Sequence, residues 1–280
     1  MLVVALKDRI DTSFSGYKKL LEFYRTCRDH TNQMVHIDFY ELEWIDANNS
    51  ALFEAILYKL SKENGLMFSS DLEFLQAKFE VLFRNGFLKT GEKVEDHKRS
   101  TVPSKSFDCK DKNGVCQYIT EELMNHRGMP NLDSKTKEMI EDDLIEIFCN
   151  ASYHSNTTDP IFVSGQYYPG QSLLKFTMVD LGDGFLPKIN DVTKGKVTTS
   201  LEAIKWALEG NSSKLVKERT PGGLGISRIN AYMTQNNGHL EIITGDGHWS
   251  STYKGTIFEG GRTIEGLTLP GTTINLVFNK

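Results

Sequence analysis

The chain has 280 residues, of which 39% are hydrophobic and 25% charged, and its formal net charge at neutral pH is −5. This composition is typical of a soluble globular protein with room for two domains. A net negative charge without a basic stripe argues against nucleic acid as the main partner, and no apolar run is long enough to cross a membrane. The four cysteines lack metal-ligand spacing and residues 1–6 are too short for a signal-peptide core, so we expect a cytoplasmic protein with reduced thiols.

Residues 1–90 alternate between strand-like and helix-like segments. The apolar spacing predicts strands at 2–6, 34–39 and 66–68, and helices at 15–27, 51–60 and 74–83. This order indicates an α/β domain. Residues 91–104 are polar, mixed in charge and contain Pro103, so we interpret them as a linker to a second domain at 105–280.

Three stretches of the first domain carry a resemblance to a known family. They are Leu6-Lys7-Asp8-Arg9-Ile10-Asp11-Thr12, the pair Ile37-Asp38-Phe39 and Trp44-Ile45-Asp46, and Phe83-Arg84-Asn85-Gly86-Phe87. They resemble the STAS domain of anti-sigma-factor antagonists. The resemblance places the phosphate acceptor at position 48, where this chain has Asn48, which offers no hydroxyl. We therefore expect a docking or scaffold module, and the alternative is a divergent α/β domain that only stabilises its neighbour.

The second domain contains a helix-like segment with three polar residues at intervals of four. Glu146, Asn150 and His154 fall on one stripe of this helix, beside the apolar face formed by Ile140, Leu144, Ile147, Phe148 and Ala151. A carboxylate and an amide in this arrangement suit a site that holds Mg²⁺ and activates a hydroxyl group or water.

Two glycine clusters follow this segment. Asp180-Leu181-Gly182-Asp183-Gly184 comes after a predicted strand at 173–179, and Gly222-Gly223-Leu224-Gly225 precedes a predicted helix. Backbone N–H groups at a helix N-terminus point outward and suit a phosphate. Each cluster alone could be an ordinary turn.

In this order, the motifs resemble those of the GHKL ATPases over residues 101–280. Residues 146–150 are similar to the N box, 180–184 to the first glycine box and 222–225 to the second. The stretch from Leu269 to Phe278, which contains Gly271-Thr272, is similar to the last motif. The N box resembles that of the anti-sigma-factor serine kinases. The resemblance implies an α/β sandwich with helices on one side of a mixed sheet, and a nucleotide lid at about 186–220 with a helix at 200–208.

The resemblance also implies a role for each motif residue. Glu146 would be the general base, Asn150 the Mg²⁺ ligand and Asp180 the acceptor for the adenine amino group. Gly182 and Gly184 would let the backbone approach the base, and Arg219 would be a lid cation for the γ-phosphate. The remaining ATP contacts would come from Gly223, Leu224, Gly225 and Thr272. Each residue also has a structural explanation: Glu146 as a solvated charge, Asn150 as a local cap, His154 as a structural histidine and Asp180 as a turn former.

We therefore expect an enzyme of cytoplasmic signalling that depends on ATP and Mg²⁺ and couples nucleotide state to a protein partner. It would be either a serine/threonine kinase acting on a separate STAS-domain or regulatory protein, or an ATPase switch. The alternative is a non-catalytic module that binds a protein when ATP is bound. A histidine-kinase role is disfavoured because no phosphoacceptor helix pair precedes the second domain. The sequence leaves the partner, the pathway and any homo-oligomer open.

Overall fold

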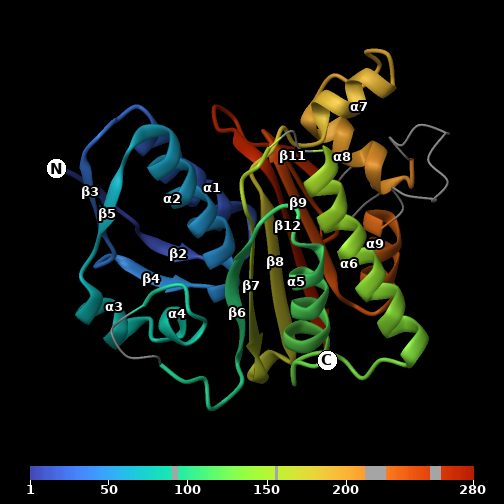
Figure 1. Ribbon diagram of the computed structural model, residues 1–280, viewed down its shortest axis with the longest axis horizontal. Helices are drawn as coiled ribbons and strands as arrows, with labels where there is room; N and C mark the ends of the chain where they lie inside the picture. Colours follow the sequence, from blue (N-terminus) through green and yellow to red (C-terminus); the bar gives the residue numbers. More distant parts are fainter. Residues whose placement is uncertain (90–93, 155–156, 212–224, 253–259) are drawn as a thin grey trace.

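The computed structural model describes residues 1–89, 94–154, 157–211, 225–252 and 260–280, with only the backbone given at 152–154 and 269 (Figure 1). The chain is an α/β protein with parallel sheets and helices in its N-terminal part and an antiparallel sheet with helices after it. In the described residues, no helix has the length and apolar character needed to span a membrane.

The N-terminal part contains two small parallel sheets covered by helices. Strands β1 (Leu2–Ala5), β3 (Met34–Asp38) and β5 (Met67–Ser69) form one sheet, and β2 (Asp8–Ile10) pairs with β4 (Leu42–Ile45). The helices are α1 (Phe14–Arg28), the 3₁₀ turn η1 (Ala47–Asn49), α2 (Ser50–Asn64), α3 (Leu72–Lys78) and α4 (Val81–Arg84). These elements confirm the predicted order. The single helix expected at 74–83 is wrong, because the chain leaves helical geometry at Phe79 and divides it into α3 and α4.

The described residues after 94 form one sheet of seven strands, in the order β11-β10-β9-β12-β8-β7-β6. The strands are β6 (Thr101–Phe107), β7 (Ile161–Tyr168), β8 (Leu173–Asp180), β9 (His239–Gly245), β10 (Gly247–Ser250), β11 (Gly261–Thr263) and β12 (Leu269–Asn279). The expectation of a mixed sheet is wrong, because every pairing among these described strands is antiparallel. Strand β6 also begins inside the stretch predicted to be a linker.

Helices cover one face of this sheet. They are α5 (Lys112–Tyr118), the π-helix η2 (Ile119–Met124), α6 (Ser134–His154), α7 (Leu186–Val192), α8 (Ser200–Leu208) and α9 (Gly225–Gln235), while η3 (Pro169–Gln171) joins β7 to β8. Side chains alternate along each strand, so Leu174, Phe176 and Met178 of β8 point into the core beneath α6 and α9. The helix predicted at 200–208 is confirmed as α8.

The N-terminal part covers the opposite face of the sheet (Figure 1). Phe162, Val179 and Ile243 of the sheet belong to the same apolar core as α1 and α2. Polar groups surround this core: the Ala47 N–H donates to Gln166 at 2.6 Å, and Lys175 pairs with the buried Asp46 at 2.6 Å. The seven-stranded sheet therefore has one face under its own helices and one face under the N-terminal part.

Candidate functional site

Helix α6 carries the predicted catalytic residue on the side that faces α9. Ile140, Leu144 and Phe148 are buried in the core over the sheet, as the apolar periodicity predicted. Glu146 lies beside this buried stripe and is largely shielded, with 16% of its side chain exposed. Asn150 follows one turn later and is half-buried. The helix therefore places both residues along its edge, in the order that the sequence indicated.

Gly225, the last residue of the second glycine cluster, lies against Glu146. It is the first residue of α9, and a Cβ atom at this position would lie 3.1 Å from the Asp143 carbonyl oxygen and 3.3 Å from Glu146 Oε2. Both distances are shorter than ordinary van der Waals contact, so glycine allows α9 to begin directly beside the carboxylate. Two residues that are 79 positions apart by their numbers, and that the sequence assigned to one site, are therefore neighbours.

Asp180 ends β8 on the same sheet face as the helices, because it alternates in register with Phe176 and Met178. Its Oδ1 accepts a hydrogen bond from the Gly182 N–H at 2.9 Å, so the predicted turn is held by the carboxylate itself. Burial raises the pKa of Asp180 to about 7, and the hydrogen bond from Gly182 opposes this only in part. A carboxyl group with such a pKa changes charge near neutral pH.

Thr272 lies directly opposite Asp180, since β12 pairs with β8 at these two residues. Both side chains are buried. The predicted first glycine box and the predicted last motif are therefore adjacent in space.

Thr244 is a residue of this region that the sequence analysis missed. It stands opposite Thr272 on the other neighbour of β12, donates a hydrogen bond to the Gly271 carbonyl at 3.0 Å, and accepts one from the Phe185 N–H at 3.2 Å. Gly184 has φ of 73° and approaches so closely that a Cβ atom there would lie 2.3 Å from Thr244 Oγ1. Thr244 therefore ties the turn after Asp180 to the strand that carries Thr272.

Arg228 and Asp143 were also missed. Arg228 lies in the first turn of α9 and forms an ion pair with Asp143, and its Nη2 is 3.6 Å from Glu146 Oε2. Burial raises the pKa of Asp143, although the Arg228 guanidinium acts in the opposite direction. A charged residue one helical turn before Glu146 was visible in the sequence, but its partner on α9 was not.

Part of the predicted site falls outside the described residues. This applies to Arg219, Gly223 and Leu224, and to the side chain of His154. Among the described residues, no three His, Cys, Asp or Glu side chains cluster in a way that could hold a metal ion. The proposed Mg²⁺ ligand, Asn150, is not of these types and stays a prediction.

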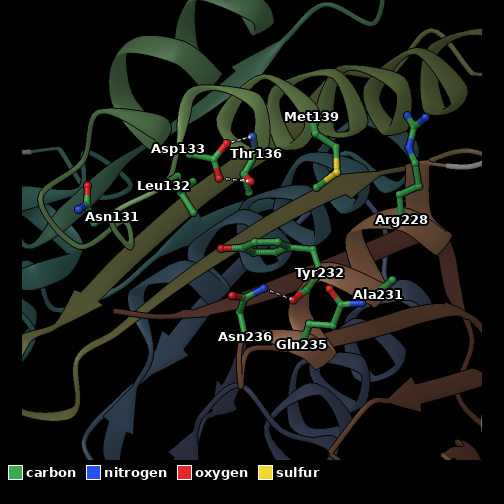
Figure 2. A pocket seen from close by; sticks show the side chains of 10 residues that line it. All are labelled: Asn131, Leu132, Asp133, Thr136, Met139, Arg228, Ala231, Tyr232, Gln235 and Asn236. Carbon is green, nitrogen blue, oxygen red and sulfur yellow. Dashed lines mark hydrogen bonds between the residues drawn. The ribbon is translucent and has the colours of Figure 1, made fainter.

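A groove of about 430 Å³ lies between α6 and α9 (Figure 2). It is lined by Asn131, Leu132, Asp133, Thr136, Met139, Arg228, Ala231, Tyr232, Gln235 and Asn236. Its two charged residues already have partners inside the protein: Asp133 accepts hydrogen bonds from Thr136, and Arg228 pairs with Asp143. Both charged residues of the groove therefore have a partner within the protein.

No family model, curated protein or solved structure matches this chain. The assignment of a function consequently depends on the site itself.

Proposed function

We propose that this chain is a GHKL-type enzyme that depends on ATP and Mg²⁺ and couples nucleotide state to a protein partner. The observation that carries the proposal is the position of Glu146 against Gly225, where α9 begins. A helix N-terminus favours phosphate groups, and a carboxylate beside it can accept a proton from water or from a hydroxyl group. The same carboxylate also lies 3.6 Å from Arg228 of α9, so the test below must separate a catalytic role from a structural one.

The residues present fit a bound nucleotide. Asp180 has a buried carboxylate at the end of β8, suited to accept a hydrogen bond from the adenine amino group. Thr272 lies beside it with a hydroxyl group. The start of α9 at Gly225 would receive the phosphates, and the Asn150 amide oxygen, a hard ligand, would bind Mg²⁺. The cation would neutralise charge that develops on the phosphates.

The phosphoryl group would go to water or to a separate protein. We interpret the N-terminal part as a STAS-like docking module, in agreement with its parallel strands and its sequence motifs. Asn48, at the position of the STAS acceptor, is buried on the opposite face of the sheet from Asp180. This arrangement supports a kinase with a separate substrate, or an ATPase switch, over a chain that phosphorylates its own N-terminal part.

The test combines binding and turnover. Calorimetry should detect Mg-ATP binding to the wild-type protein, and γ-labelled ATP should release labelled phosphate or label a protein in cell extract. Glu146→Gln should bind ATP but lose about 10²-fold or more in turnover. Asn150→Ala should lose the dependence on Mg²⁺ and most of the turnover. The matched control is Glu138→Gln, which removes an exposed carboxylate from the same helix and should change neither quantity.

Two outcomes would contradict the proposal in different ways. ATP binding without turnover in the wild-type protein would favour the non-catalytic nucleotide-gated module. Turnover by Glu146→Gln at the wild-type rate would remove the general base from the proposal while leaving nucleotide binding in place.

A further inference from the structure

Arg228 connects two acidic residues of α6 at the start of α9. Its Nε donates a hydrogen bond to Asp143 Oδ1 at 2.8 Å, and its Nη2 donates to the same oxygen. The same Nη2 is 3.6 Å from Glu146 Oε2. Figure 2 shows Arg228 leaving α9 and extending beside α6. One guanidinium group therefore contacts both the buried carboxylate and the carboxylate of the proposed base.

Asp143 fixes the orientation of this guanidinium. Its side chain is 0% exposed, whereas 47% of the Arg228 side chain is exposed. Asp143 Oδ2 is buried and has no hydrogen-bond partner among the described residues. The hydrogen bonds that Arg228 donates to Oδ1 are therefore the contacts that compensate the charge of this carboxylate. A guanidinium is planar and rigid, and holding two of its nitrogens against one oxygen limits its rotation. The buried Asp143 therefore determines which edge of the Arg228 guanidinium faces Glu146.

We propose that Arg228, oriented by Asp143, is a positioning residue that holds the Glu146 carboxylate in place for proton transfer. A base that is itself oriented by a third group is a general feature of activated sites. This inference rests on the proposed function, since it assigns a role relative to Glu146. Joining α6 to α9 would require only the pair between Arg228 and Asp143, and the approach to Glu146 is what indicates the additional role.

The experiment measures Arg228→Ala in two backgrounds, wild type and Glu146→Gln. If Arg228 acts through Glu146, turnover should fall about 10-fold or more in the wild-type background and change less than about twofold in the Glu146→Gln background, because coupled residues are not additive. Mg-ATP affinity should stay within about threefold in both. Guanidinium ion at low concentration should restore part of the lost turnover in Arg228→Ala and none in the double variant.

A second pair of variants covers the case in which Arg228→Ala does not fold. Asp143→Asn/Arg228→Gln removes both charges together, and thermal unfolding verifies that it folds. This double variant should likewise lose turnover in the wild-type background and change it little in the Glu146→Gln background. Arg228→Lys keeps the charge without the planar fork and should retain intermediate turnover.

The outcomes separate this inference from the proposed function. Equal losses of turnover in the two backgrounds, without rescue by guanidinium, would make Arg228 a structural link and overturn this inference alone. A wild-type protein that binds Mg-ATP but does not turn it over would overturn the catalytic assignment and this inference together.

Discussion

Asn48 Nδ2 donates a hydrogen bond of 2.8 Å to Thr177 Oγ1, joining the N-terminal part to the centre of the seven-stranded sheet. Thr177 in turn donates to Asn275 Oδ1 at 2.5 Å. All three side chains are fully buried. Since Thr177 and Asp180 are three residues apart on one strand, they point to opposite faces of the sheet. The position where a STAS domain would carry its phosphate acceptor is thus enclosed, on the face away from the candidate nucleotide site.

Substituting a serine at this position should therefore not create a phosphorylation site in the folded protein. Asn48→Ser supplies a hydroxyl group, but the group would stay between the two parts of the chain and out of reach of Glu146. Intact-mass spectrometry after long incubation with Mg-ATP should show no added phosphate at residues 40–60 in the wild-type protein or the variant. Ser50 is buried too and should stay unmodified. Stoichiometric labelling of the introduced serine, or of Ser50, would mean that the two parts separate during turnover.

Removing one partner of the buried ion pair between Asp46 and Lys175 should destabilise the protein strongly. Asp46 is buried and accepts hydrogen bonds from the Thr12 N–H, Trp44 Nε1 and the Tyr168 hydroxyl as well as from Lys175. Asp46→Ala leaves Lys175 without its partner and should lower the free energy of unfolding by about 3–5 kcal/mol. Urea denaturation measures this change. The double variant Asp46→Leu/Lys175→Met should lose less, because it leaves no buried charge unpaired.

The same pair predicts acid sensitivity. Burial alone would raise the pKa of Asp46, but Lys175 and the hydrogen bonds keep it below the usual value. A lowered carboxyl pKa stabilises the fold at pH values above the unfolded-state pKa of about 3.9, and this stabilisation is lost as the pH falls further. Asp46→Leu/Lys175→Met should thus lose less stability than the wild-type protein below pH 4. Identical acid unfolding of the two proteins would contradict the prediction.

Local patterns in the sequence predicted several of the elements and named residues of the candidate site. Helical spacing of apolar residues indicated α6, a helix was expected at 200–208 where α8 lies, and the glycine and aspartate motifs pointed to Asp180 and Gly225. The sequence patterns did not predict the specific side-chain contacts between distant segments. The pairing that sets Thr244 beside Thr272, and the pairing of Arg228 with Asp143, depend on how β9, β12, α6 and α9 assemble. The prediction of a mixed sheet was wrong for a similar reason. The alternation of side chains along a strand does not encode whether its neighbour is parallel or antiparallel.

Under the proposed function, the affinity of the protein for adenine should depend on pH through Asp180. With a pKa of about 7, the Asp180 carboxyl is largely protonated at pH 6 and largely ionised at pH 8. The ionised form accepts the stronger hydrogen bond, so affinity should increase over this interval by up to about 10-fold. Calorimetry with adenosine avoids titration of the ligand phosphates. Asp180→Asn should weaken binding by about 1–3 kcal/mol and remove the pH dependence, because an amide does not titrate. Unchanged adenosine affinity in a folded Asp180→Asn protein would exclude this residue from base recognition.

The buried carboxyl of Glu241 should make the protein less stable as the pH rises towards and past neutrality. Glu241 lies on β9, on the sheet face that the N-terminal part covers, and accepts a hydrogen bond of 3.1 Å from the Ser250 hydroxyl. Burial raises its pKa to about 7. Since the folded-state pKa lies above the unfolded value of about 4.3, the folded protein binds the proton more tightly, and the resulting stabilisation is lost as the pH rises from about 4.3 to 7.

Glu241→Gln tests this dependence directly. The amide keeps an oxygen that can accept from Ser250 and carries no charge, so the variant should exceed the wild-type protein in free energy of unfolding at pH 8 by about 1–3 kcal/mol. The difference should shrink or reverse at pH 5, where the wild-type carboxyl is protonated.

Asp180 titrates in the same direction, and the Asp180→Asn background therefore separates the two contributions. Glu43→Gln, at an exposed position, is the matched control and should leave stability unchanged at both pH values. Urea denaturation at pH 5 and pH 8 makes the comparison, and a Glu241→Gln protein less stable than wild type at pH 8 would show that the ionised carboxylate is accommodated without cost.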